Sequence, residues 1–328
     1  MHRYSYYKTA ACTPNVSIGD PQANKEEILN CIQKLDSDTQ LVVFPELCIT
    51  GYTCQDLFYE HTLLNKAKQV LFEIVEESPE NLVTVLGLPL EIENKLYNCA
   101  AICFNHDILG IQVKTYIPSY NEFYETRWFS SASELKENTT FNFKNKKVPV
   151  SNHIVFKDTT TSACLGVEIC EDLWVTIPVS STHALAGANV LCNVSASNEI
   201  ISKANYRRNL VKDQSAKCYA GYVYASAGPT ESSSDLVFSG HNLICENGTI
   251  LSETNTDKII YGQIDLDHLN HDRLHYKTSM QDLFHVNYTT VEFASKPIEE
   301  IEFDRYIDAY PFVPNNQDER ITRCLEIL

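Results

Sequence analysis

The chain has 328 residues, 44% of them hydrophobic, and a formal net charge of −17 at pH 7. That length accommodates one large domain or two small ones, and the hydrophobic content is typical of a globular fold with a sizeable core. The negative charge argues against binding to nucleic acids or anionic membranes, because such surfaces attract basic patches.

The sequence also lacks recognisable targeting and metal-binding signals. No run reaches the ~18 apolar residues of a membrane span, and the first seven residues lack the apolar stretch of a signal peptide. The twelve cysteines occur singly, without a Cys-x-x-Cys pair, so we predict free thiols and no metal site. These features predict a cytoplasmic protein that binds neither membrane nor nucleic acid.

Strands and helices alternate along the chain. Apolar runs predict strands over residues 7–16, 41–44, 81–89, 95–104, 110–114, 163–169, 189–194, 221–227, 236–245, 249–253 and 259–264, the last being the final strand. Helices are predicted over residues 20–36, 60–77, 179–188 and 202–218. Residues 130–150 are polar and are predicted to form a loop. Alternation with several hairpins predicts an α/β fold with a mixed sheet.

Two turns carry specific signals. Asp20 followed by Pro21 is typical of a helix N-cap and first helical position. Asn247-Gly248, which lies between two predicted strands, is typical of a type I′ hairpin turn.

Three predicted strands end in side chains that can carry chemistry. Glu46 follows strand 41–44, Lys114 ends strand 110–114, and Cys170 follows strand 163–169. Taken singly, these residues would be a solvated loop acid, a surface lysine and a buried inert thiol. Ligands of α/β proteins bind at the ends of strands, so the three together form a candidate site.

The segments around these residues resemble the nitrilase (carbon–nitrogen hydrolase) superfamily, which has a Glu-Lys-Cys triad. The segment Phe44-Pro45-Glu46-Leu47-Cys48-Ile49-Thr50-Gly51-Tyr52 is similar to the family's Glu segment. Three further segments resemble the branch of the family that is attached to glutamine-dependent NAD synthetase. They are Asp56-Leu57-Phe58, Lys114-Thr115-Tyr116-Ile117-Pro118-Ser119-Tyr120-Asn121-Glu122-Phe123-Tyr124-Glu125 and Glu168-Ile169-Cys170-Glu171-Asp172-Leu173-Trp174. The resemblance implies a four-layer α-β-β-α sandwich, with two sheets face to face and helices outside.

The chemistry of such a triad follows from its residue types. An amide carbon is a poor electrophile, so its hydrolysis needs a strong nucleophile and stabilisation of the oxyanion. Glu46 would take the proton of Cys170, pass it to the leaving ammonia, and then activate water against the thioester. Lys114 would lower the thiol pKa and hold the oxyanion with the backbone N–H of Glu171. The implied reaction needs no cofactor and no metal.

The resemblance also implies glutamine as the amide donor. Tyr120 and Ser197 would contact the substrate, and Lys203 would meet its α-carboxylate. The family often has arginine at that last place, and lysine keeps the charge but loses the bidentate fork. Tyr52 and Glu171 are candidates for binding the α-amino group.

Several alternatives remain open at this point. Either Glu122 or Glu125 could support Lys114. His183 lies 13 residues after Cys170 (183 − 170) and is a rival base in a Cys–His arrangement. Lys203, together with Arg207 and Arg208, could instead form a solvated helix face.

The chain is predicted to divide into a carbon–nitrogen hydrolase (glutaminase) domain over residues 1–270 and a second part over residues 271–328. This second part would hold a linker, marked by Pro311 and Pro314, and the first helix of a synthetase half that is otherwise absent. The phosphate loop of ATP pyrophosphatases is missing from the sequence, so ATP and magnesium would belong to the absent half.

The predicted function is therefore hydrolysis of the side-chain amide of L-glutamine, supplying ammonia for NAD synthesis. The expected partners are L-glutamine, a synthetase domain or subunit, and further copies of this chain in a homo-oligomer. Two alternatives are an amidase or nitrilase acting on another small amide, and a non-catalytic module that regulates a synthetase.

Overall fold

The computed structural model describes residues 5–281, 285–296, 298, 300–307, 309 and 316–327. Its first sheet has eight strands. In sheet order these are β14 (Ile259–Asp265), β1 (Tyr6–Cys12), β2 (Leu41–Val43), β3 (Val83–Ile92), β4 (Lys95–Phe104), β5 (Asp107–Val113), β7 (Lys146–Ser151) and β6 (Thr140–Phe143).

The second sheet has seven strands. Their order is β13 (Thr249–Thr254), β12 (Asn242–Glu246), β11 (Gly221–Ser226), β10 (Val190–Ser195), β9 (Cys164–Ile169), β8 (Ile154–Asp158) and β15 (Thr289–Phe293). Both sheets mix parallel and antiparallel pairs: β9, β10 and β11 run parallel, and β12 turns back antiparallel.

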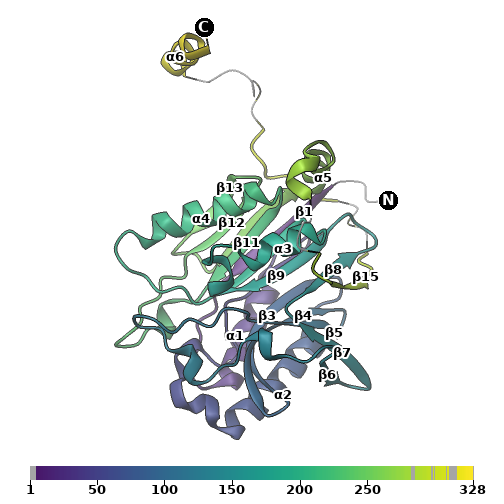
Figure 1. Cartoon of the computed structure of the whole chain (residues 1–328), viewed down its shortest axis with the longest axis vertical. Coiled ribbons are helices and arrows are strands. Elements are labelled where there is room, and N and C mark those ends of the chain that lie inside the picture. The colour runs from purple at the N-terminus through teal and green to yellow at the C-terminus, as the bar shows by residue number, and fades with distance from the viewer. Residues whose placement is uncertain are drawn as a thin grey trace.

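The two sheets pack face to face. Val43 and Val85 of the first sheet share one buried cluster with Val167 and Val194 of the second. Helices α1 (Pro21–Gln33) and α2 (His61–Glu77) pack on the outer face of the first sheet, and α3 (Val179–Leu185) and α4 (Lys203–Lys217) pack on that of the second. Figure 1 shows these helix pairs on opposite sides of the molecule. The predicted α-β-β-α sandwich is confirmed.

Local signals explain where several elements begin and turn. The Asp20 side chain accepts a hydrogen bond from Ala23 N at 3.1 Å, and Pro21 opens α1, as predicted. In the β12–β13 hairpin, Asn247 and Gly248 have φ of 45° and 81°. Both values are positive, as the predicted type I′ turn requires.

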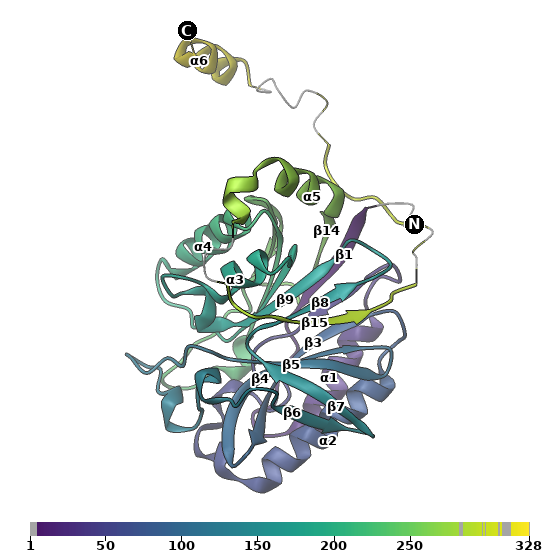
Figure 2. The same cartoon turned by 45° about the vertical axis from the view of Figure 1, so that its right-hand side comes forward.

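Three predictions about the elements are wrong. Residues 130–150 are not all loop, because they contain β6 and most of β7; Phe141 and Phe143 alternate inward there and pack on Phe72. Residues 236–241 precede β12 instead of belonging to it. The strand at residues 259–264 is not the last one, because β15 returns to pair with β8 in parallel (Figure 2).

The chain after β14 continues through helix α5 (Leu266–His275) and β15 to helix α6 (Gln317–Ile327). In Figures 1 and 2, α6 stands apart from the sandwich, and it has no buried residue. Pro311 and Pro314, predicted to mark a linker, lie outside the described residues. Among the helices of the described ranges, none has both the length and the apolar character needed to cross a membrane.

One glycine in β3 allows the loop that carries Glu46 to pass close to the sheet. A Cβ atom on Gly87 would lie 2.5 Å from the Pro45 carbonyl oxygen and 2.8 Å from the Glu46 carbonyl carbon. Both are backbone atoms, so they cannot move away without displacing the loop that carries Glu46.

We therefore expect Gly87→Ala to lower the free energy of unfolding by about 3 kcal/mol, the upper end for overpacking a core. Urea unfolding measures this loss. The matched control is Gly228→Ala, whose Cβ would lie 2.7 Å from a side-chain methyl of Thr13, whereas the nearest backbone atom, the Pro14 carbonyl oxygen, is 3.9 Å away. Equal losses in the two variants would contradict the proposed role of Gly87.

Candidate active site

The three predicted catalytic residues converge at the ends of strands from both sheets. Glu46 follows β2, Lys114 follows β5, and Cys170 follows β9. Lys114 Nζ donates a hydrogen bond to Glu46 Oε1 at 2.6 Å, with both side chains fully buried. Cys170 is 6% exposed, and the charges of Glu46 and Lys114 both act on its thiol.

A second carboxylate holds the lysine from the other side. Lys114 Nζ lies 2.8 Å from each carboxylate oxygen of Glu125, which opens the short turn η2 (Glu125–Arg127). Tyr52 donates its hydroxyl to Glu125 Oε1 at 2.7 Å. The structure thus selects Glu125 as the support of Lys114, whereas Glu122 accepts from Asn198.

These contacts fix the charge on Lys114. Burial alone would lower the lysine pKa, but the charges of Glu125 and Glu46 outweigh it and hold the pKa of Lys114 well above its ordinary value. The ammonium group therefore stays protonated at neutral pH, as an oxyanion-stabilising group must.

Glu46 is oriented by groups from both sheets. Asn98, on β4, donates to its Oε1 at 2.6 Å, and the backbone N–H of Ala196, after β10, donates to its Oε2 at 2.9 Å. Burial raises the pKa of Glu46, against the opposing charge of Lys114, which suits a carboxylate that must take up a proton. Sequence reasoning missed Asn98, although a polar residue within an apolar strand was the available signal.

Cys170 occupies a strained turn. Its φ is 46°, in the left-handed region that non-glycine residues seldom adopt, and it opens the 3₁₀ turn η4 (Cys170–Leu173) directly after β9. Burial and then the charge of Glu46 raise the pKa of the thiol, while Lys114 opposes them. The resting thiol is therefore protonated, and forming the thiolate requires a base in contact with it.

A buried aspartate joins the lysine segment to the cysteine turn. Asp172 Oδ1 accepts from the backbone N–H groups of Thr115 and Tyr116 at 3.1 and 2.9 Å, and Oδ2 accepts from Ile169 N at 3.1 Å. One side chain thus fixes the residues after Lys114 relative to the strand before Cys170. The sequence alone predicted no separate role for Asp172 beyond its place in the cysteine motif.

The predicted substrate residues surround this centre, but several of them bond to one another. The Tyr120 hydroxyl donates to both carboxylate oxygens of Glu171, at 3.0 and 2.9 Å, beside an open cavity. Tyr52 uses its hydroxyl on Glu125 and its backbone N–H on Glu231, at 2.7 Å each.

Ser197 lies in the segment between β10 and α4, and Lys203 is the first residue of α4. Lys203 Nζ donates to the Asn198 side-chain oxygen and lies 5.1 Å from the Trp174 ring centre and 5.6 Å from that of Phe123. Ser197 is buried and accepts from Arg207 Nε at 3.3 Å.

The prediction of a solvated helix face is wrong for Arg207. Its side chain is 0% exposed, and its Nη2 donates to the backbone oxygen of Asn198 at 3.0 Å. Arg208 is partly exposed and pairs with Glu253. The charge pattern of the helix could not predict that Arg207 points inward, because the groups that hydrogen-bond to Arg207 lie on other segments of the chain.

His183 is packed instead of poised for catalysis. It is fully buried, its Nε2 lies 2.8 Å from the Val167 carbonyl oxygen, and burial lowers its pKa to about 4. These contacts give no support to the Cys–His alternative.

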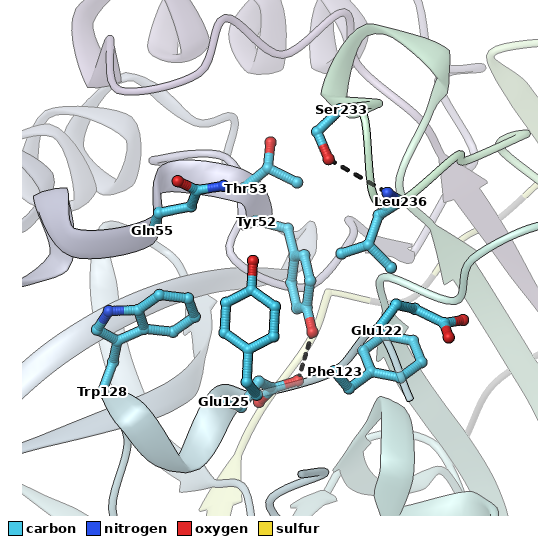
Figure 3. Close-up of a pocket in the computed structure, with 10 residues that line it drawn as sticks. Tyr52, Thr53, Gln55, Glu122, Phe123, Glu125, Trp128, Ser233 and Leu236 are labelled. Atoms are coloured by element: carbon cyan, nitrogen blue, oxygen red, sulfur yellow. Dashed lines mark hydrogen bonds between the residues drawn. The ribbon is translucent and has the colours of Figure 1, made fainter. Parts of the chain in front are cut away.

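A small cavity is lined by Tyr52 and Glu125, whose side chains are joined by a hydrogen bond. Figure 3 shows its walls, which include Tyr52, Glu122, Phe123, Glu125, Trp128 and Leu236. Within the described ranges, no group of three or more His, Cys, Asp or Glu side chains is placed to hold a metal ion. The arrangement present is a buried thiol, two buried carboxylates and a buried ammonium group.

Comparison with known proteins agrees with this geometry. The family model for carbon–nitrogen hydrolases matches residues 8–273. The chain belongs to the carbon–nitrogen hydrolase family. Glu46, Lys114 and Cys170 all lie inside the matched region of the hydrolase.

Among the hydrolase's relatives, a glutamine-dependent NAD(+) synthetase of Mycobacterium tuberculosis is 34% identical over 338 residues, covering 99% of this chain and 50% of that protein. A human protein of the same name is 30% identical over 256 residues, covering 74% and 35%. A crystal structure of such a synthetase from Cytophaga hutchinsonii matches with a TM-score of 0.70 and 28% identity, covering 79% and 43%. The chain thus spans about half the length of the first of these relatives.

Because the charges of the site are buried, we predict that removing the Lys114 ammonium lowers the free energy of unfolding by an amount that depends on pH. We expect Lys114→Met, which keeps most of the side-chain volume, to lower the free energy of unfolding by about 3–5 kcal/mol at pH 7.5, because two buried carboxylates lose their counter-ion. Without the lysine, the pKa of Glu46, which burial already raises, rises further in the folded state. The loss is therefore largest at high pH and shrinks as pH falls and Glu46 takes up a proton.

Urea unfolding at pH 5 and pH 7.5 tests this expectation. The control is Lys95→Met, because Lys95 pairs with Glu134 at the surface, where both side chains are more than 40% exposed. That substitution should cost at most about 1 kcal/mol at either pH. A cost for Lys114→Met that does not change with pH would mean that the two carboxylates are not coupled through the lysine.

Proposed function

We propose that this chain hydrolyses the side-chain amide of L-glutamine to glutamate and ammonia through a thioester on Cys170. The observation that carries the proposal is the fully buried Lys114 ammonium, held between Glu46 and Glu125 beside the Cys170 thiol. That centre combines the nucleophile, the base and the fixed positive charge that amide cleavage demands. The similarity to glutamine-dependent NAD(+) synthetases supports glutamine as the amide.

The first half-reaction acylates the enzyme. Glu46 takes the proton of Cys170, and the thiolate sulfur attacks the amide carbon to form a tetrahedral adduct. Lys114 and the backbone N–H of Glu171 stabilise its oxyanion. When the carbon–nitrogen bond breaks, Glu46 gives the proton to the leaving nitrogen, and ammonia departs from the thioester.

The second half-reaction returns the enzyme to its starting state. Water replaces ammonia, Glu46 takes one of its protons, and the hydroxide equivalent attacks the thioester carbon. The carbon–sulfur bond breaks, the proton returns to Cys170, and glutamate leaves. Glu125 holds Lys114 in the same position throughout, so the oxyanion site does not need to reorganise between the two steps.

Charges of both signs around the site suit the zwitterionic part of glutamine. We place its α-carboxylate near Lys203 and its α-amino group near Glu171, with Tyr120, Ser197 and Tyr52 as further contacts. Lys203 is within electrostatic reach of Cys170 and Glu171, which supports this orientation.

The fate of the ammonia follows from the relatives. Because they are synthetases that depend on glutamine, we propose that the ammonia passes to a synthetase domain or subunit that makes NAD from deamido-NAD. ATP and magnesium would serve that partner, and the hydrolase itself would need no cofactor. A cytoplasmic location and assembly into a homo-oligomer complete the proposal.

Ammonia release from a panel of amides tests the activity. L-glutamine should be hydrolysed far faster than asparagine, acetamide or propionamide, and Cys170→Ala should abolish the reaction while keeping the unfolding midpoint of the wild type. A glutamine-derived electrophile should label Cys170 before the other eleven thiols, although Cys324 is exposed. Preference for another amide would show a different amidase, and no hydrolysis at all would favour a regulatory module.

Substrate recognition gives a second test. Lys203→Ala should raise the KM for glutamine by about 10–100-fold, the scale for losing a charged hydrogen bond, and lower kcat much less. Lys212→Ala, at an exposed position of the same helix, serves as the matched control and should leave KM unchanged. Equal KM values in all three proteins would place the α-carboxylate elsewhere.

A further inference from the structure

A cluster of ionisable side chains lies behind the segment that carries the proposed glutamine contacts. We call residues 195–203, which run from the last residue of β10 to the first residue of α4, the substrate arm. Arg207 and Arg208 on α4 meet Glu253 on β13 and His241, which directly precedes β12. His241 is 3% exposed, so this cluster is closed to solvent where it touches the arm.

Arg207 holds the substrate arm by three hydrogen bonds. Its Nε donates to Ser197 Oγ at 3.3 Å, its Nη2 donates to the backbone oxygen of Asn198 at 3.0 Å, and its Nη1 donates to Glu199 Oε2 at 3.1 Å. The Asn198 side chain in turn donates to Glu122 and accepts from Lys203. Through these hydrogen bonds, the position of Arg207 affects the position of Lys203, which is proposed to bind the substrate carboxylate.

The contacts of His241 specify one protonation state. Arg207 Nη1 lies 2.7 Å from His241 Nδ1, and a guanidinium group can only donate, so Nδ1 must carry a lone pair. His241 Nε2 lies 2.7 Å from Glu253 Oε1 and therefore carries the proton. The ring is neutral, with its hydrogen on Nε2.

We propose that His241 is a positioning residue, which keeps the substrate arm in its binding conformation only while its ring is neutral, so that glutamine affinity falls in acid. This inference rests on the proposed function, because it takes the arm to be the part that binds glutamine. No role for His241 was evident from the sequence.

The charge balance of the cluster explains the sensitivity. Two arginines face two glutamates: Arg207 pairs with Glu199 at 3.1 Å and Arg208 with Glu253 at 2.6 Å, which leaves no net charge. A proton on Nδ1 would add one positive charge and point it at the guanidinium of Arg207. Burial lowers the pKa of His241, Glu253 opposes that effect, and Arg207 and Arg208 add to it.

Protonation would therefore remove the acceptor at Nδ1 and replace it with repulsion. Arg207 Nη1 contacts both His241 and Glu199 of the arm, so repulsion from the ring would push the guanidinium out of the position in which it holds the arm. Because the same guanidinium also holds Ser197 and Asn198, that movement would loosen the arm. Because the folded-state pKa lies below the ordinary value of 6.5, the neutral form is present at pH 7.5 and is lost only as pH falls through that lowered pKa.

The test measures glutamine binding by calorimetry, with the chemistry removed by Cys170→Ala. In this background the Kd for glutamine, followed from pH 7.5 down to pH 5, should rise by about fivefold or more as the His241 ring takes up its proton, the lower end of typical coupling between two sites. Adding His241→Gln should keep the Kd near its pH 7.5 value and remove most of the pH dependence. The side-chain amide introduced by His241→Gln can accept a hydrogen bond from Arg207 and donate one to Glu253, but it does not titrate.

The outcomes separate the inference from the proposed function. Absence of glutamine binding at every pH, with and without His241→Gln, would overturn the proposed function and this inference with it. Binding that weakens equally in acid with and without His241→Gln would overturn the inference alone.

A spectroscopic measurement tests the geometry without any substrate. The ¹⁵N shifts of His241 at pH 7.5 should show a protonated Nε2 and an unprotonated Nδ1, and the reverse tautomer or a charged ring would overturn the proposal. His241→Leu, which offers no acceptor, should raise the Kd at both pH values while remaining folded by circular dichroism. If His241→Leu unfolds, the His241→Gln comparison still decides the question.

Discussion

The buried ion group of Lys114, Glu46 and Glu125 is the constraint on which the site depends. Two carboxylates and one ammonium lie out of water, where an unpaired charge is costly, so each member needs the others in place. The group also cannot form within one segment, because its members follow β2 and β5 and open η2. Catalytic geometry and folding of the first sheet are therefore linked through the same three side chains.

The second sheet brings the nucleophile to this group. Cys170 is held by a turn with positive φ at the end of β9, and Asp172 hydrogen-bonds the segment after Lys114 to the strand before that turn. Ala196, after β10, donates its backbone N–H to Glu46. Contacts between the sheets thus set the distance between base and nucleophile, and the apolar core that they share keeps the sheets in register.

The substrate arm is held in place by a buried side chain of α4. Arg207 donates to the backbone oxygen of Asn198, its charge is balanced by Glu199 of the arm, and its Nη1 contacts His241. A rigid support of this kind allows an irregular segment to present Ser197 and Lys203 in fixed positions. The cost is that the arm depends on the protonation state of a buried histidine.

The sequence by itself determined the features that depend on neighbours along the chain. Apolar runs located most of the strands, capping signals located the start of α1, and Glu46, Lys114 and Cys170 were found because each ends a strand within a recognisable segment. Only the tertiary structure decided which glutamate supports Lys114, that Arg207 is buried, and that β15 closes the edge of the second sheet. Those outcomes depend on partners far apart in the chain, and the energy of a buried charge or an added strand exists only once those partners meet.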